Sequence, residues 1–145
     1  MRIPERLLIA ACPFGRRLDE VRACEAVAEG VRAAGRPWPD LCPLGSGKAG
    51  GELQALLGEL DFDGRLRAAR ALVVAAWGLR REGLGESVAF ELATRARQAG
   101  VPAYGILGGS RLDEFDARMM DLQVMLEARD EEGLREAGRE LGSIA

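Results

Sequence analysis

The sequence predicts an α/β fold, namely a three-layer αβα sandwich built on a five-stranded parallel sheet. Short apolar segments alternate with segments of helical periodicity along the whole 145-residue chain. No repeat and no linker-like stretch interrupts this alternation. Such alternation is typical of parallel strands joined by right-handed crossover helices. The length and the unbroken pattern predict one domain over residues 1–145.

Each predicted strand is a short apolar run that stops at turn-forming residues. The first run, RLLIAA, ends before Pro13 and Gly15, and the run ALVVAA is the most strongly apolar. Runs without alternation of polar and apolar residues indicate strands that are covered on both faces. The predicted strands span residues 6–11, 38–44, 71–76, 101–107 and 122–126.

The predicted helices carry apolar residues three or four positions apart. In the first helix Cys24, Val27 and Val31 have this spacing, Asp19 is the expected N-cap, and Gly35 ends the pattern. The predicted helices span residues 19–34, 52–60, 84–99 and 131–141, the last with a frayed tail. A short helical piece is expected at 113–119, and 61–69 is interpreted as a plain connection.

We expect the strand order 2-1-3-4-5, in which the winding direction reverses between the first and third strands. Ligands of open parallel sheets bind beyond the carboxyl ends of the strands that flank such a reversal. The candidate site therefore consists of the loops that follow the strands. These loops are residues 12–18 and 77–85, with 45–51 and 108–111 beside them.

The composition narrows the chemistry of this site. The chain has no histidine, and its three cysteines lack metal-ligand spacing, so we predict no metal site. A net charge of -3 argues against general attraction to nucleic acid or to an anionic membrane. No apolar run reaches the roughly 20 residues that span a bilayer, and the N-terminus does not fit a signal peptide. A cytoplasmic location is therefore expected.

Arginines gather in two of the candidate loops. Arg16 and Arg17 follow the first predicted strand, and Arg80 and Arg81 follow the third. Guanidinium groups bind phosphate and carboxylate in bidentate fashion, so this pattern predicts a site for a small anion. The alternative is that both pairs form a solvated rim without a ligand.

The loop GSGKAGG offers a second set of anion contacts. It carries the only lysine of the chain, Lys48, and precedes a predicted helix. Glycine backbone and the free N–H groups at a helix start favour close approach of an anion. Cys42 and Ala49 exclude a Walker A motif. The alternative is a turn with a solvated lysine.

Cys12 and Trp77 complete the candidates. Cys12 lies near two arginines and a helix start, a setting that favours a thiolate, but most cysteines in such a position are small buried fillers, and we expect the same here. Trp77 ends a strand, where it either stacks on a ligand ring or lies half-buried under a loop. The ligand-binding candidates are Cys12, Arg16, Arg17, Ser46, Gly47, Lys48, Gly50, Trp77, Arg80, Arg81, Gly108, Gly109 and Ser110.

Several segments resemble motifs of the glycerate kinase family, whose members phosphorylate glycerate at the 2-position with ATP. AACPFGRRL at 10–18 occupies the place of the family's A-P-D-S-F-K-G-S-L, and AVAEG at 26–30 that of A-I-x-x-G. ALVVAAWG at 71–78 and AGVPAYGILGGS at 99–110 resemble L-V-I-T-G-E-G and G-V-P-V-I-A-L-A-G-S. The resemblance implies the family's Rossmann-like domain without its second domain.

The polar residues of the family's motifs are replaced in this chain. Motif aspartate, glutamate and lysine positions fall on or near Cys12, Gly15, Ser46, Ala49, Trp77 and Arg81. Phosphoryl transfer from ATP needs carboxylates that hold Mg²⁺, and arginine cannot replace a metal ligand. The resemblance together with these replacements implies a chain with degenerate kinase motifs.

Three functions follow from these observations. The leading hypothesis is a stand-alone glycerate-kinase-like domain that binds a small phosphorylated or carboxylated metabolite without a cofactor. The first alternative is an oligomeric glycerate kinase that uses ATP and Mg²⁺, with carboxylates from Glu82, Glu86 and Asp113 or from a second subunit. The second alternative is a homodimeric scaffold that pairs through the apolar edge strand at 122–126.

Overall fold

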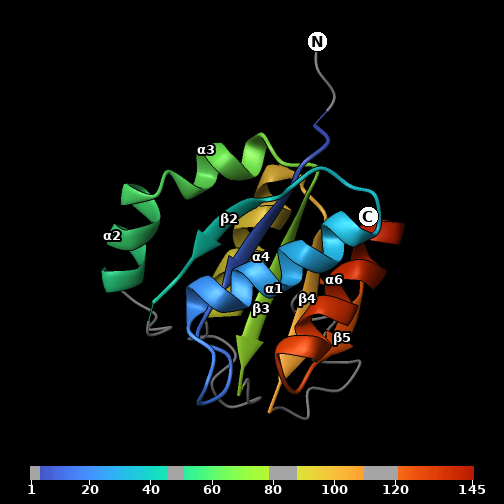
Figure 1. Cartoon of the computed structure of the whole chain (residues 1–145). Helices are drawn as coiled ribbons and strands as arrows, with labels where there is room; N and C mark the ends of the chain where they lie inside the picture. The colour runs from blue at the N-terminus through green and yellow to red at the C-terminus, as the bar shows by residue number, and fades with distance from the viewer. Residues whose placement is uncertain (1–3, 46–50, 79–87, 110–120) are drawn as a thin grey trace.

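A computed structural model describes residues 4–45, 51–78, 88–109 and 121–145. Its centre is a five-stranded sheet in the order β2-β1-β3-β4-β5, in which all neighbouring strands run parallel (Figure 1). This arrangement confirms the predicted fold class and strand order. The strands are β1 (Leu7–Ala11), β2 (Asp40–Pro43), β3 (Ala71–Trp77), β4 (Ala103–Gly108) and β5 (Met125–Glu127).

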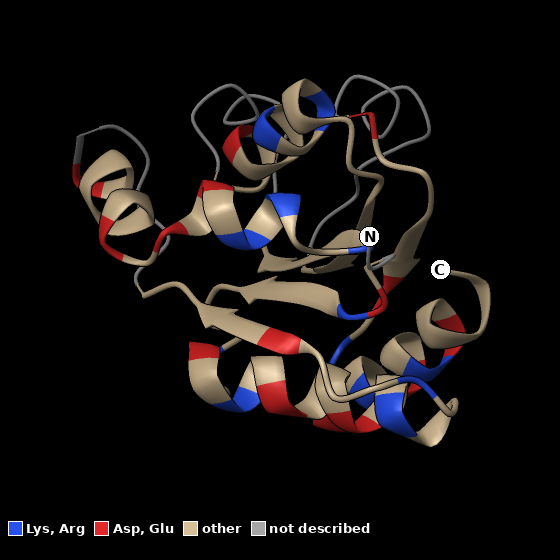
Figure 2. Ribbon diagram, turned by 90° about the horizontal axis from the view of Figure 1, so that it is seen from above, with Lys and Arg blue, Asp and Glu red and all other residues tan. Residues whose placement is uncertain are grey.

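Helices cover both faces of the sheet (Figure 2). One face carries α1 (Glu20–Ala33) and α6 (Glu131–Ile144), whose apolar residues pack with one side of β1. The other face carries α2 (Gly51–Glu59), α3 (Phe62–Arg67) and α4 (Val88–Ala99). The predicted three-layer sandwich is therefore confirmed.

The sheet divides the core into two halves, and β1, one of its inner strands, contributes to both. Leu7, Ile9 and Ala11 pack against the layer of α1 and α6, whereas Leu8 and Ala10 pack against the opposite layer. Side chains alternate between the faces of a strand, so a strand with helices on both sides has to be apolar at every position. All residues of β1 are buried accordingly.

Most strand ends differ from the predicted ones, by three residues at most. Trp77 pairs with Gly108, which extends both β3 and β4 by one residue beyond the predicted ends. β2 begins at Asp40 rather than at Trp38, because the intervening Pro39 has no N–H for the ladder. β5 is a short edge strand that begins only at Met125.

The interpretation of residues 61–69 as a plain connection is wrong, because they contain the helix α3. Phe62 and Leu66 are one helical turn apart, and both are buried against the core. Arg65 holds this helix to β2, since its Nε and Nη2 donate to the Asp40 carboxylate at 2.9 and 2.7 Å. The helix is thus stabilised by contacts with distant residues rather than by its own length.

The last helix is longer than predicted and does not fray at residue 141. It continues to Ile144, and the following Ala145 is buried. The Arg36 guanidinium donates through Nε to the Gly142 carbonyl at 2.8 Å and through Nη2 to the Ala145 carbonyl. These hydrogen bonds satisfy carbonyl groups that the end of a helix leaves without internal partners.

Helices α1 and α6 approach each other backbone to backbone. A Cβ atom at Gly30 would overlap the carbonyl oxygen of Arg135, and one at Gly138 would overlap that of Val27. Glycine is therefore required at both positions if the two helices are to keep this separation.

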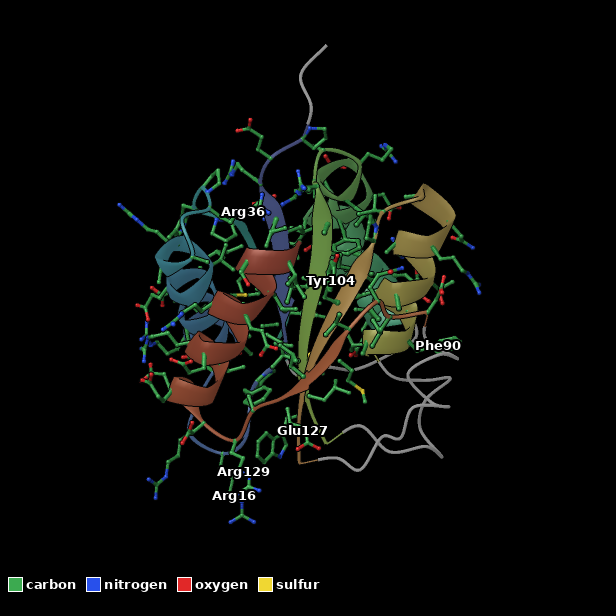
Figure 3. All side chains as sticks on the ribbon, turned by 90° about the vertical axis from the view of Figure 1, so that its right-hand side faces the viewer. Arg16, Arg36, Phe90, Tyr104, Glu127 and Arg129 are labelled. Carbon is green, nitrogen blue, oxygen red and sulfur yellow. The ribbon has the colours of Figure 1, made fainter. Side chains whose placement is uncertain are left out.

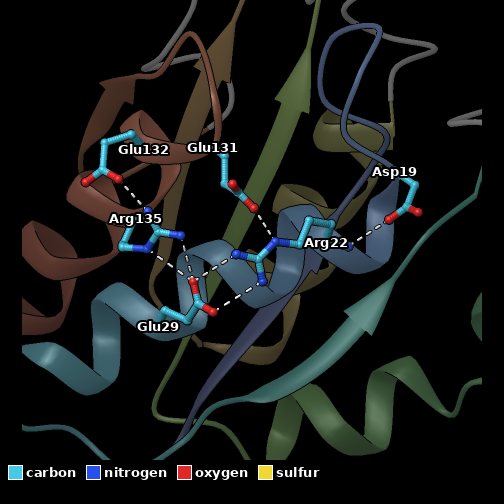
Figure 4. Close-up of polar contacts among 6 residues, drawn as sticks. All are labelled: Asp19, Arg22, Glu29, Glu131, Glu132 and Arg135. Atoms are coloured by element: carbon cyan, nitrogen blue, oxygen red, sulfur yellow. Dashed lines mark hydrogen bonds and ion pairs between the residues drawn. The ribbon is translucent and has the colours of Figure 1, made fainter.

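A cluster of ion pairs crosses the same helix contact (Figure 4). Glu29 of α1 accepts hydrogen bonds from Arg22 at 3.1 Å and from Arg135 of α6 at 3.0 Å. Arg22 also pairs with Glu131. Hydrogen bonds from the two guanidinium groups hold the pKa of the Glu29 carboxyl below its usual value. These ion pairs thus help to fix the position of α1 along α6, and Gly30 and Gly138 allow the two helices to approach so closely.

Within the four described ranges, no helix combines the length and the apolar character that crossing a membrane requires.

We expect Gly138→Ala to lower the free energy of unfolding by about 1–3 kcal/mol, because its methyl group would overpack the α1–α6 contact. Chemical denaturation with urea measures this change. Gly58→Ala is the matched control, because the added methyl group there meets no atom within 4 Å. At Gly58 the better helix propensity of alanine should leave stability unchanged or raise it by up to about 1 kcal/mol. Equal effects at both positions would contradict the close helix approach.

Candidate functional site

The carboxyl ends of the central strands are held together by backbone hydrogen bonds. Cys12 N–H, just after β1, donates to the Ala75 carbonyl of β3 at 3.0 Å. Gly78 N–H, just after β3, donates to the Gly108 carbonyl of β4 at 2.6 Å. The winding reverses between β1 and β3. The first loop and the ends of β3 and β4 therefore form one continuous rim, at the place where open parallel sheets bind ligands.

Trp77 is the largest side chain at this rim, and 41% of its surface is exposed. The Phe14 ring meets it edge to face, with 5.1 Å between the ring centroids. Gly15, Gly108 and Gly109 lie against its indole ring. A Cβ atom would lie 2.6 Å from Cζ3 of the indole at Gly108 and 2.7 Å from Cε2 at Gly109. The absence of side chains at these glycines therefore makes room for the tryptophan.

The first loop is folded so that its arginines face solvent. Phe14 is buried, and its N–H donates to the Leu18 carbonyl at 2.8 Å, which closes a turn over the residues between them. Gly15 has a φ of 72°, in the left-handed region that favours glycine. Arg16 and Arg17 at the tip are exposed, and neither forms an ion pair with any residue in the described ranges. Figure 3 shows Arg16 extending away from the sheet.

Asp19 is the N-cap of α1, as the sequence predicts. Its carboxylate accepts a hydrogen bond from Arg22 N–H at 2.7 Å. This contact satisfies one donor of the helix start that an anion would otherwise use. An anion at this loop therefore depends on the guanidinium groups more than on the helix start.

Of the two interpretations of Cys12, a reactive thiolate or a small buried filler, the structure contradicts the thiolate. Its side chain is buried beside the core, on the face of the sheet that α2, α3 and α4 cover. Burial, with a smaller contribution from the charge of Glu20, raises the pKa of the Cys12 thiol to about 11. The alternative of a small buried filler is the correct one, because alternation along β1 and the residue after it turns this side chain inward.

Of the predicted ligand contacts, the structure brings Trp77, Gly108 and Gly109 into direct contact with one another, beside the loop that carries Arg16 and Arg17. Other predicted residues lie outside the described ranges, so their placement stays a prediction. They are Ser46, Gly47, Lys48, Gly50, Arg80, Arg81 and Ser110, and for the kinase alternative Glu82, Glu86 and Asp113.

Sequence reasoning missed Arg129 at the same rim. This exposed arginine follows β5 and has no ion-pair partner among the described residues. Figure 3 shows Arg129 and Arg16 at the same end of the molecule. The rule that ligands bind beyond the carboxyl ends of parallel strands also covers Arg129, but the predicted candidate loops follow only the first four strands. The predicted fifth strand spans 122–126, whereas β5 spans Met125–Glu127.

The described residues include no group of three or more histidine, cysteine, aspartate or glutamate side chains arranged to hold a metal ion. The predicted homodimer has one structural prerequisite, since β5 is an edge strand of the sheet. Pairing through this edge stays a prediction.

Comparison with solved structures shows the fold. A de novo designed protein with the Rossmann 2x3 fold superimposes with a TM-score of 0.54 at 12% identity, covering 94% of this chain and 88% of that chain. This chain therefore has a Rossmann-like α/β fold. No family model matches the sequence. No curated protein matches it either.

Two natural proteins give weaker superpositions. A protein provisionally designated glycerate kinase 2 from Salmonella typhimurium LT2 has a TM-score of 0.48 at 14% identity, over 72% of this chain. This chain spans only about a quarter of that protein, 26%. A response regulator receiver domain from Rhodospirillum rubrum has a TM-score of 0.49 at 16% identity, covering 94% of this chain and 91% of that domain. Both are distant structural resemblances and nothing more.

We expect Cys12 to resist alkylation by iodoacetamide at pH 7.5 in the folded protein, because burial keeps its thiol protonated. Mass spectrometry of peptides from native and urea-unfolded samples measures the labelling. Cys24, whose pKa burial raises to about 12, is the internal control and should be protected to a similar degree. Rapid labelling of Cys12 alone in the native protein would contradict its burial and would support the interpretation of Cys12 as a reactive thiolate.

Proposed function

We propose that this Rossmann-like chain binds a small anion, a phosphorylated or carboxylated metabolite, at the carboxyl edge of its sheet. Arg16 and Arg17 supply the charge. The observation that carries the proposal is the position of two adjacent exposed guanidinium groups, without carboxylate partners in the described ranges, beside the reversal between β1 and β3.

Most other arginines in the described chain have structural explanations, whereas Arg70, Arg129 and Arg139 are exposed and have no ion-pair partner in the described ranges. Arg22, Arg65, Arg95 and Arg135 are paired with carboxylates of their own or of neighbouring elements. Others stand in the last turn of a helix, where a positive charge offsets the helix dipole, as Arg97 does in α4. Arg16 and Arg17 have neither explanation, because they lie in a loop ahead of the α1 N-terminus.

The loop is anchored well enough to present its charges in one place. Phe14 and Cys12 are buried under it, and the Phe14–Leu18 hydrogen bond closes it at 2.8 Å. Anchoring of this kind lowers the ordering cost that long side chains impose on binding, because the backbone that carries them is already fixed. Bidentate contact from a guanidinium then supplies both affinity and orientation for a phosphate or carboxylate.

We expect inorganic phosphate to shift the backbone amide resonances of residues 14–18 in an ¹⁵N-HSQC titration at low salt. The double variant Arg16→Gln, Arg17→Gln should weaken this binding at least about tenfold, because it removes both charge-assisted contacts. Raising the ionic strength should weaken it as well, because both groups are exposed to screening.

The matched control is the double variant Arg67→Gln, Arg70→Gln. It removes two exposed arginines near the start of β3, at the amino ends of the strands and therefore at the opposite end of the sheet from the proposed site. This control should bind phosphate like the parent protein. Equal affinity in all three proteins, or shifts that spread over the surface without clustering at 14–18, would refute the site.

A further inference from the structure

We infer that the ligand of this rim carries a flat ring as well as its anionic group, with the ring stacked on Trp77 and a second cation supplied by Arg129. The inference rests on the proposed anion-binding function and names the class of ligand.

A series of backbone contacts brings the loops of the two arginines close to the indole. Gly15, the residue before Arg16, lies against the Trp77 ring. The ring also lies against Gly108, and a Cβ atom at Gly108 would come within 2.7 Å of the carbonyl oxygen of Ala128, the residue before Arg129. The two loops that carry Arg16 and Arg129 therefore both lie next to the strand ends around the indole. Figure 3 shows both labelled arginines at this end of the sheet.

The indole is positioned rather than merely left exposed. The Phe14 ring packs against it with the two ring planes 74° apart, and Gly15, Gly108 and Gly109 lie against its ring atoms. With 41% of Trp77 still exposed, the rim presents a large apolar surface to solvent next to charged groups. Exposed aromatic surface bordered by polar groups marks binding sites, because burying it under a ligand is favourable.

The charges at the rim agree with an anionic ligand. Arg129 is exposed and forms no ion pair in the described part of the chain, whereas Glu127, two residues earlier, is an exposed carboxylate that opposes an anion there. Asp19 is engaged as a helix cap. The guanidinium groups of Arg16 and Arg129 are thus available to a phosphate or carboxylate. A ring attached to that group would lie over the indole, where offset stacking is favourable.

The experiment compares two probes that differ only in the ring, phenyl phosphate and methyl phosphate. A Trp38→Phe background leaves Trp77 as the sole tryptophan, so that its fluorescence reports on the rim alone. Trp38 is exposed just before the start of β2, at the end of the sheet opposite the site, so its replacement should not disturb the site. Phenyl phosphate should change the Trp77 emission and bind roughly two- to tenfold more tightly than methyl phosphate.

Arg129→Gln tests the second cation and Arg70→Gln is its control, since both residues are exposed and lie at opposite ends of the sheet. Arg129→Gln should weaken the binding of phenyl phosphate about two- to fivefold, because it removes one exposed charge-assisted contact. Arg70→Gln should leave the affinity unchanged. Equal weakening by both variants would show general electrostatics and overturn the role of Arg129.

The outcomes separate this inference from the function on which it rests. If both phosphates bind with equal affinity at residues 14–18 and Trp77 emission stays constant, the ring inference is overturned and the anion site stands. If neither phosphate binds, the anion site itself is refuted, and the ring inference with it. Tighter binding of phenyl phosphate that depends on Arg129 supports both.

Discussion

The parallel pairing of β1 with β2 on one side and β3 on the other is the constraint on which the rest of the structure depends. It encloses β1 between two strands, and all of its residues are apolar and buried. It also makes the chain wind in opposite directions on its two sides. The loop after β1 is consequently brought beside the ends of β3 and β4, and the candidate site exists because of that reversal.

The contact between α1 and α6 fixes the position at which this loop ends. α1 starts directly after the loop, and its glycine-mediated contact with α6 allows it little freedom to move on the sheet. α6 in turn follows the short segment that carries Arg129. The two loops that flank Trp77 are therefore attached to the two helices that are packed most closely. Loops attached to rigid elements of this kind are suited to binding, because they lose little conformational entropy when a ligand binds.

Much of the fold follows from local pattern. The strands and their order are predictable because runs covered on both faces lack alternation, as in ALVVAA. α3 was not predictable, because only six residues form it and a distant carboxylate, that of Asp40, holds its Arg65. The inward turn of Cys12 depends on which face of β1 each residue occupies, and a run without alternation does not reveal that. The contact of Trp77 with Gly15, Gly108 and Gly109 joins three separate segments, for which local sequence carries no signal.

The meeting of three segments on one indole is the central claim, and nuclear Overhauser effects from the Trp77 ring protons test it most directly. The structure predicts cross-peaks to the Hα protons of both Gly15 and Gly109, since a Cβ atom built on each would lie 3.8 Å and 2.7 Å from the nearest ring atom. Such peaks would show the first loop and the end of β4 converging on the tip of β3. Cross-peaks to only one of these glycines, or to neither, would show that the first loop and the end of β4 do not both contact the indole, which would contradict the account.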